Sequence, residues 1–273
     1  PMDSFHFFDS GYRVLNGEVP FKDYWLVKGP LLDYIQAAFF YLFGVNWYAY
    51  VFHASVFNAI ISISTFFVLK NFKLKIEYCF LYSLLISILA YPSSGTPFID
   101  HHSSFFSLLA IYSLLIAINN KVLYWWILSP ILFGLAFLSK QVPAAYIISI
   151  LSFVLLLYFY VSKKIDYLKY FLIGIFSFVF FILIFGKLQN ITLSSFLDQF
   201  IFYPQTIGLS RFSNFNLSFI ILEKYIFIFI SVSLLIYINI KNIFTFKKYK
   251  KSNEFFFFLI LFFFLLSLLL HQL

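Results

Sequence analysis

The chain has 273 residues, of which 62% are hydrophobic and only 11% are charged, and its mean hydropathy is +0.92. A soluble domain usually carries about 25% charged residues, so this composition excludes an ordinary water-soluble protein. The net charge of +8 could suggest nucleic-acid binding, but the basic residues stand in short clusters between apolar runs, as membrane loops do. The sequence therefore predicts an integral membrane protein with no nucleic-acid partner.

The first part of the chain, residues 1–46, is rich in charged residues and precedes the first long apolar run. Within it, residues 31–43 are apolar but carry Asp33 and Gln36, and they end at Gly44, which suits a helix stop. This segment is too short to span a bilayer if the next run does. We therefore expect a helix that lies on the membrane surface or packs over the outer ends of a helix bundle.

From residue 47 onward, apolar runs alternate with short polar loops. A spanning helix needs roughly 20 apolar residues, and about 17 can suffice. The predicted spans are residues 47–69, 77–92, 104–118, 122–138, 144–161, 169–186, 217–240 and 254–273. The sequence thus predicts an all-α, polytopic transmembrane bundle of about eight helices over 47–273, with an extended, partly helical outer loop over 1–46 in front of it.

The polar segments between the spans fall into two sets that should face opposite sides. The first set consists of residues 70–76, 119–121, 162–168 and 241–253. The second set consists of residues 1–46, 93–103, 139–143 and 187–216. The first set and its flanks hold most of the lysines, although the second set is longer, so the positive-inside rule makes the first set cytoplasmic. We expect a bacterial inner-membrane protein whose outer loop faces the periplasm or exterior.

The two ends of the chain suggest a piece of a longer protein. It begins with Pro1 instead of Met and stops within an apolar run. We expect a fragment that lacks sequence at both ends, with the bundle truncated at the C-terminus.

Several short motifs follow one another in a fixed order. The first segment contains Asp3, Gly17, Pro20-Phe21-Lys22-Asp23, Lys28-Gly29-Pro30-Leu31 and Phe43-Gly44, and later come "PFIDHHSS" and "GLAFLSKQVPAAYI". This string resembles the outer loops of membrane-embedded C-type glycosyltransferases, among them the protein mannosyltransferases and the aminoarabinose transferases of lipid A. The resemblance covers about residues 1–160, with Ser4 where a Glu often follows the first Asp.

The resemblance implies a reaction and roles for charged residues. The donor would be a polyprenyl-phosphate sugar in the membrane, and the acceptor would be a hydroxyl on a lipid, glycan or protein. A carboxylate has to take the proton of the acceptor as it attacks with inversion, and Asp3 is the candidate base. A cation has to stabilise the leaving phosphate, and Lys28 is the first choice, followed by Lys140 and Arg211.

Asp100 and Asp23 each have alternative interpretations. Asp100 would orient the acceptor or the base, or it would hold a divalent metal ion together with His101 or His102. Neighbouring residues on a helix point about 100° apart, so the two histidines are a poor chelate as a pair. Asp23 either contributes to substrate binding or only orients a turn after Pro20.

Two other functions stay open at this point. A transporter or flippase for lipid-linked material would carry charges at mid-membrane and would show symmetric halves. A non-catalytic membrane subunit would tolerate alanine at Asp3 and Lys28. The predicted spans are nearly free of charged residues and contain no internal repeat, so the sequence favours the glycosyltransferase.

Overall fold

The computed structural model describes residues 2–90, 95–207, 225–244 and 252–272. Its helices are α1 Met2–Leu15, α2 Leu31–Phe43, α3 Trp47–Asn71, α4 Ile76–Leu89, α5 Ile99–Asn120, α6 Leu123–Ser139, α7 Gln141–Ser162, α8 Ile165–Leu188, α9 Leu193–Leu197, the π-helix η1 Asp198–Phe202, α12 Ile226–Phe244 and α14 Asn253–Gln272. These ranges contain no β-strand. The all-α fold class is confirmed.

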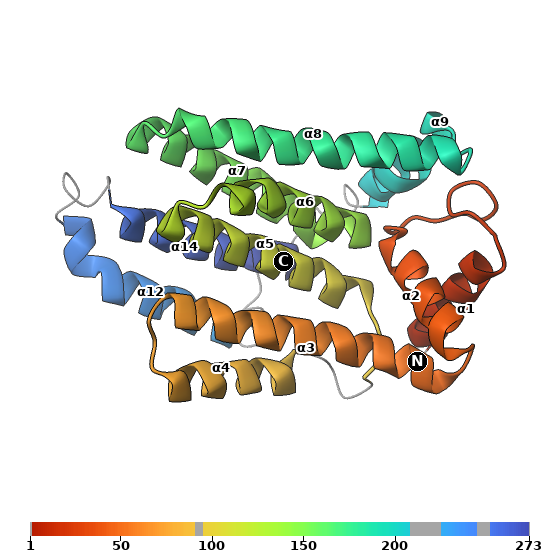
Figure 1. Cartoon of the computed structure of the whole chain (residues 1–273), viewed down its shortest axis with the longest axis horizontal. Helices are drawn as coiled ribbons and strands as arrows, with labels where there is room; N and C mark the ends of the chain where they lie inside the picture. The colour runs from red at the N-terminus through yellow and green to blue at the C-terminus, as the bar shows by residue number, and fades with distance from the viewer. Residues whose placement is uncertain (1, 91–94, 208–224, 245–251, 273) are drawn as a thin grey trace.

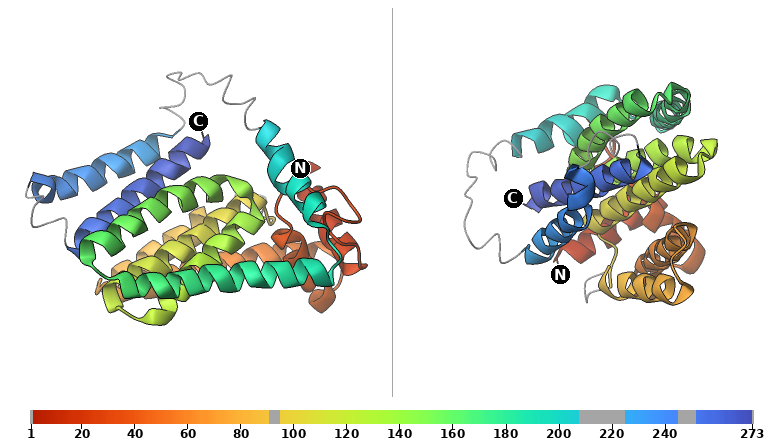
Figure 2. Two further views of the ribbon diagram at one scale, coloured as in Figure 1. Left: turned by 90° about the horizontal axis from the view of Figure 1, so that it is seen from above. Right: turned by 90° about the vertical axis from the view of Figure 1, so that its left-hand side faces the viewer.

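Helices α3 to α8 run back and forth along one direction, with α12 and α14 beside them (Figures 1 and 2). A helix stands at each of the eight predicted spans, although residues 217–224 lie outside the described ranges. Helices α3, α5, α7 and α8 are long and apolar enough to cross a membrane by length and composition. Helices α4 and α6 are shorter, with 14 and 17 residues.

Described residues that belong to or flank three loops of the predicted cytoplasmic set, 70–76, 119–121 and 241–253, lie together at one end of the bundle. The side chain of Asn119, at the end of α5, donates to Asn71 at the end of α3 over 3.2 Å. Asn253, at the start of α14, donates to the carbonyl oxygen of Ile118 over 3.2 Å. These contacts agree with the predicted grouping of these three loops, whereas the side of the membrane that each end faces stays a prediction.

The core of the bundle lies between α5, α6, α7 and α14. Trp126 is fully buried there, and its ring stacks on those of Tyr158 and Tyr167. Helix α8 differs, because most of its length is exposed and its exposed residues are large and apolar, such as Phe176 and Phe180. A helix with that surface is suited to contact lipid.

Helices α1 and α2 lie across the opposite end of the bundle, and we call residues 2–43 the N-terminal cap (Figures 1 and 2). Helix α2 has the predicted bounds and ends at Gly44, whose φ of 82° only glycine adopts readily. Helix α1 was not predicted. Its surface pair Arg13 and Asp9, 2.8 Å apart, has the i,i+4 spacing of a helix, and Phe7 forms part of its buried face.

Candidate active site

The N-terminal cap meets the bundle where α3, α5 and α7 begin and where α6 ends (Figure 1). The loop between α1 and α2 is tied down by two glutamine side chains. The amide of Gln141, in the first turn of α7, donates to the carbonyl oxygen of Val27 over 2.9 Å. The amide of Gln199 donates to the carbonyl oxygen of Phe21 over 2.9 Å and accepts from the N–H of Leu26 over 2.8 Å. These bonds fix the path of the loop just before Lys28.

Gly29 brings this loop into direct contact with the end of α6. A Cβ atom on Gly29 would lie 1.7 Å from the carbonyl oxygen of Leu138, so no larger residue fits without a backbone shift. Lys28 and Pro30 are therefore packed next to the α6–α7 junction, which carries Lys140. Two motifs that are far apart in the sequence, one at Lys28 and the other at Lys140, thus pack against each other.

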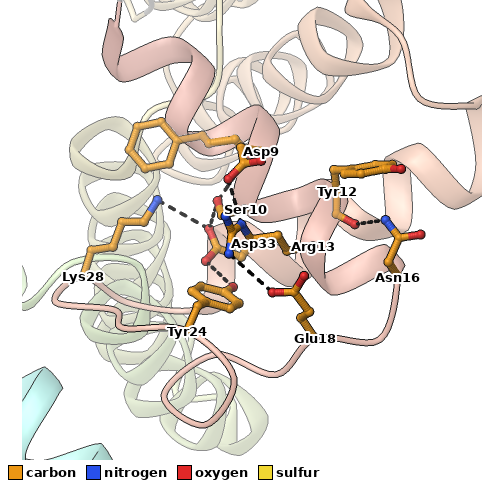
Figure 3. A network of polar contacts seen from close by, with 10 residues as sticks. Asp9, Ser10, Tyr12, Arg13, Asn16, Glu18, Tyr24, Lys28 and Asp33 are labelled. Carbon is orange, nitrogen blue, oxygen red and sulfur yellow. Dashed lines mark hydrogen bonds and ion pairs between the residues drawn. The ribbon is translucent and has the colours of Figure 1, made fainter.

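Asp33 is the centre of a buried polar network in the cap (Figure 3). Its side chain is fully buried. One carboxylate oxygen accepts from the hydroxyl of Ser10 over 2.7 Å, and the other accepts from the hydroxyl of Tyr24 over 3.0 Å. Asp33 also stands in the first turn of α2, where the helix dipole favours a negative charge. Burial, followed by the nearby Asp33, raises the pKa of Tyr24 above its ordinary value, so Tyr24 remains a neutral donor.

Lys28 is the cation of this network. Its ammonium lies 3.5 Å from Asp33 Oδ1 and 3.6 Å from the ring centroid of Phe7, and its side chain is only 8% exposed. Among the described residues, no group forms a hydrogen bond with Lys28 Nζ. Burial lowers the pKa of Lys28 to about 8, against the opposing effect of Asp33. The site therefore holds a buried ammonium with unused N–H groups, which is suited to bind an anion.

A second polar group of the cap starts one turn further along α2. The amide oxygen of Gln36 lies 2.7 Å from Nδ1 of His53 in α3. His53 Nε2 in turn lies 3.0 Å from His102 Nε2 of α5. His102 Nδ1 lies 3.0 Å from the carbonyl oxygen of Phe98. All three polar side chains are fully buried, so α2, α3 and α5 are connected by a continuous hydrogen-bonded chain.

Asp100 and Lys140 form a second ion pair beside the cap. Lys140 Nζ and Asp100 Oδ1 are 2.5 Å apart, and each side chain is about 30% exposed. Ser103, one turn after Asp100, donates to the carbonyl oxygen of Lys140 over 3.3 Å. The pair therefore joins α5 to the α6–α7 junction and keeps one face open to a ligand.

An apolar groove with a volume of about 530 Å³ runs along the outside of this region. Its walls come from the cap loop, α2, α6, α8 and α9, and its polar side chains include Tyr34 and Lys187. Burial raises the pKa of Tyr34 to about 12, and its hydroxyl is buried without a hydrogen bond within the described part of the chain. The groove is suited to an elongated apolar ligand with a polar end.

Two of the predicted site residues lie wholly or partly outside the described residues. The backbone of Asp3 belongs to α1, but its side chain lies outside the described residues, and Arg211 lies outside them entirely. The end of the bundle that carries α1 is also the end at which α5 begins with Ile99 and Asp100 (Figure 1). The roles of Asp3 and Arg211 stay predictions.

The remaining predicted residues have clear positions. Asp23 is exposed and accepts from the N–H of Val19 over 2.8 Å, which is the turn-orienting alternative. His102 faces His53, and both of its ring nitrogens are within hydrogen-bond distance of other groups. In the described residues, no group of three His, Cys, Asp or Glu side chains could hold a metal ion. The predicted metal site at His101 and His102 therefore has no geometric support there.

Sequence reasoning missed Asp33, Gln36 and His53 as members of the site. A signal was present, because Asp33 and Gln36 stand three residues apart in an otherwise apolar helix and therefore share one face. His53 is likewise a polar residue inside a predicted span. Buried polar groups of this kind need partners, which could have identified α2 as part of the site.

Comparison with known proteins gives one finding. The family profile described as dolichyl-phosphate-mannose-protein mannosyltransferase matches residues 27–185, which is more than half of the chain. The matched segment contains Lys28 with Asp33 and Asp100 with Lys140, whereas Asp3 precedes it. A search of curated proteins and a search of solved structures found no match.

Proposed function

Because this chain belongs to the dolichyl-phosphate-mannose-protein mannosyltransferase family, and is thus a membrane glycosyltransferase that uses a lipid-linked sugar donor, we propose that it transfers the sugar at the end of the bundle covered by the N-terminal cap. The donor is a polyprenyl-phosphate sugar. The acceptor is a hydroxyl group that approaches from the aqueous side of the cap. The lysine-rich loops at the other end favour a periplasmic or exterior position for the cap in a bacterial inner membrane.

The observation that carries the proposal is the buried ammonium of Lys28. It has an ion partner 3.5 Å away but no hydrogen bond among the described residues. Negative charge grows on the leaving phosphate as its bond to the sugar breaks, and a fixed cation in a water-poor site stabilises that charge strongly. A phosphate oxygen at Lys28 would replace the contact with the Phe7 ring, 3.6 Å away.

The groove beside the cap supports a prenyl chain as the lipid part of the donor. Its lining is mainly apolar, and Pro30 and Leu31, which follow Lys28 closely in the sequence, form part of its wall. A lipid chain bound there would run toward Lys28 with its phosphate end. The hydroxyl of Tyr34 provides a neutral hydrogen-bond donor at the groove.

The proposed chemistry requires one base. As the acceptor oxygen forms its bond to the anomeric carbon, the carbon–oxygen bond to the phosphate breaks, and its electron pair remains on the phosphate oxygen. The acceptor proton moves to a carboxylate, and we assign this role to Asp3. Asp3 stands four residues before Phe7 in the sequence, and the ring of Phe7 lies against the ammonium of Lys28. Asp100 is already paired with Lys140, so we assign to that pair the orientation of the acceptor and to Lys140 a secondary contact with phosphate.

The test is a transfer assay with the purified full chain in lipid vesicles. The probe is a polyprenyl-phosphate hexose labelled in the sugar, supplied with candidate acceptor lipids, glycans and peptides. The proposal expects release of polyprenyl phosphate together with labelled acceptor. Movement of intact donor between leaflets without cleavage would instead support the flippase alternative. A matched control is Lys169→Ala, because Lys169 is an exposed lysine at the opposite end of the bundle.

A further inference from the structure

The chain of buried polar groups from Gln36 to Phe98 has a single consistent direction when both imidazoles are neutral. Full burial among aromatic rings favours neutral imidazoles over a cation. A ring of Phe39 stacks on His53 with centroids 4.9 Å apart, and Phe57 lies against both imidazoles. The direction can be derived from the Phe98 end, because a carbonyl oxygen only accepts hydrogen bonds.

His102 Nδ1 must carry the proton that it donates to the Phe98 carbonyl. Its Nε2 then has no proton and accepts through its lone pair. The proton shared between the two rings must therefore be on His53 Nε2, which lies 3.0 Å from His102 Nε2. His53 Nδ1 consequently has no proton either, so it accepts a hydrogen bond and requires an N–H donor from Gln36. The amide nitrogen of Gln36 can supply it after a half-turn of the amide group, which exchanges nitrogen and oxygen.

An independent observation supports this half-turn. With its oxygen toward His53, the Gln36 amide nitrogen is buried and has no hydrogen-bond partner among the described residues. A buried, unpaired donor is costly, and the half-turn gives that nitrogen a partner. The Gln36 side chain is also held firmly, since a Cβ on Gly11 of α1 would lie 2.5 Å from Gln36 Cγ.

We propose that Gln36, His53 and His102 are positioning residues that fix α2 relative to α5 through this directional chain, which we call the histidine relay. The proposal rests on the proposed function. Asp33 stands one turn before Gln36 on α2, and Asp100 stands two residues before His102 on α5. The relay therefore sets the separation between the Lys28–Asp33 pair and the Asp100–Lys140 pair. None of the three relay residues has to touch the substrate.

The test replaces His53 by residues that keep either its shape or its polarity. His53→Phe keeps a ring between Phe39 and Phe57 but removes both hydrogen bonds. His53→Gln keeps one donor and one acceptor and is the matched control. Because a misplacement of about 1 Å can cost about 100-fold in rate, we expect His53→Phe to lower kcat/KM by about 10- to 100-fold. We expect His53→Gln to stay within about threefold of the wild type, since it conserves both hydrogen bonds.

A distance measurement tests the relay without any enzyme activity. Spin labels on Tyr41→Cys in α2 and Asn120→Cys in α5, two exposed positions, report the separation of the two helices in a Cys79→Ser background. We expect a broader or shifted distance distribution in His53→Phe and an unchanged one in His53→Gln. If the wild type transfers no sugar, the proposed function fails, whereas these distances still decide whether the relay fixes α2.

Three outcomes would overturn the relay. One is wild-type distances and kinetics in His53→Phe. Another is damage in His53→Gln that equals or exceeds the damage in His53→Phe, because a donor and an acceptor at this position would then not be enough to preserve the geometry. If His53→Phe does not fold, Gln36→Leu removes the relay from its other end. A folded Gln36→Leu protein with wild-type distances would refute the proposal equally.

Discussion

Two ion pairs at opposite ends of the bundle differ more in setting than in geometry. Lys169 and Asp166 are 3.1 Å apart and are 72% and 87% exposed. Lys28 and Asp33 are further apart, at 3.5 Å, but are 8% and 0% exposed. Water and salt screen the first pair, so it contributes little to stability. The second pair is shielded from water, so loss of either partner would leave an uncompensated buried charge. Breaking this longer contact should therefore destabilise the protein more than breaking the exposed one.

The contrast extends to the two ends of the molecule. At the lysine-rich end, charged side chains extend into solvent and are suited to set membrane orientation. At the cap end, charged and polar groups are turned inward and are hydrogen-bonded across segments that are distant in the sequence. Retaining buried charge is expensive, so its concentration at one end supports the site that we propose there. Substitutions at the two ends should therefore have unequal effects.

The largest effect is expected for Asp3→Ala, which removes the proposed base. Loss of a positioned proton acceptor typically costs about 10²–10⁴ in rate. Transfer from a labelled polyprenyl-phosphate sugar should fall by that factor, while the protein keeps its elution volume in detergent. An exposed acid at the other end, Asp166→Ala, is the control and should leave the rate unchanged. A normal rate in Asp3→Ala would remove Asp3 from the mechanism.

The next effect concerns Lys28 and its protonation. Lys28→Met should weaken use of the donor by about 10- to 1,000-fold, because a charge-assisted phosphate contact is lost. The pKa of Lys28 is lowered to about 8, so the cation is present below that pH and is lost as the pH rises through it. The wild-type kcat/KM should therefore fall above about pH 8. Lys28→Arg should keep its charge and move this fall to higher pH; an unchanged profile would contradict the phosphate role.

A third effect is on stability. Asp33→Asn leaves the buried Lys28 ammonium without its counter-charge, and breaking a buried pair from one side costs about 3 kcal/mol or more. The thermal midpoint in detergent should fall clearly in Asp33→Asn. It should recover most of the loss when Lys28→Met is added, because the unpaired charge is then gone. Asp166→Asn should leave the midpoint unchanged, and an equal drop in both single variants would mean that burial makes no difference.

The smallest effect is expected for a pair of glycine substitutions. Gly29→Ala introduces a methyl group 1.7 Å from the Leu138 carbonyl oxygen, and the backbone has to shift at a cost of about 1–3 kcal/mol. Gly186→Ala, in α8, meets no atom within 4 Å and should be neutral or slightly stabilising. Thermal unfolding of both variants measures the difference. Equal midpoints would show that the cap loop does not need its close contact with α6.

Much of the fold could be predicted from the sequence, because helices that contact lipid consist of long apolar runs. The bounds of α2, Leu31–Phe43, agree with the predicted segment, and Gly44 ends it as expected. Helix α1 escaped prediction because its buried face consists of Phe7, Ser10 and Gly11, which do not form an apolar run. The helical pattern of α1 is weak in the sequence, and its buried face can be recognised only from its packing against α2.

The candidate site was only partly predictable. Lys28 and the Asp100 and Lys140 segments were identified from ordered motifs, but their partners were not. Asp33 is linked to Ser10 across 23 residues, and His53 is linked to His102 across 49. Such contacts depend on how the helices pack, and single-sequence periodicity carries no information on that packing. For the same reason the sequence could not tell which of two adjacent histidines would face inward.

The side chain of Gln141 has one more implication. Its single amide nitrogen donates to Val27 over 2.9 Å and to Phe200 over 2.8 Å. One NH₂ group at the start of α7 thus binds a carbonyl oxygen of the cap loop and a carbonyl oxygen of η1. Replacement of this one side chain would therefore remove a hydrogen bond from the cap loop and one from η1 at the same time.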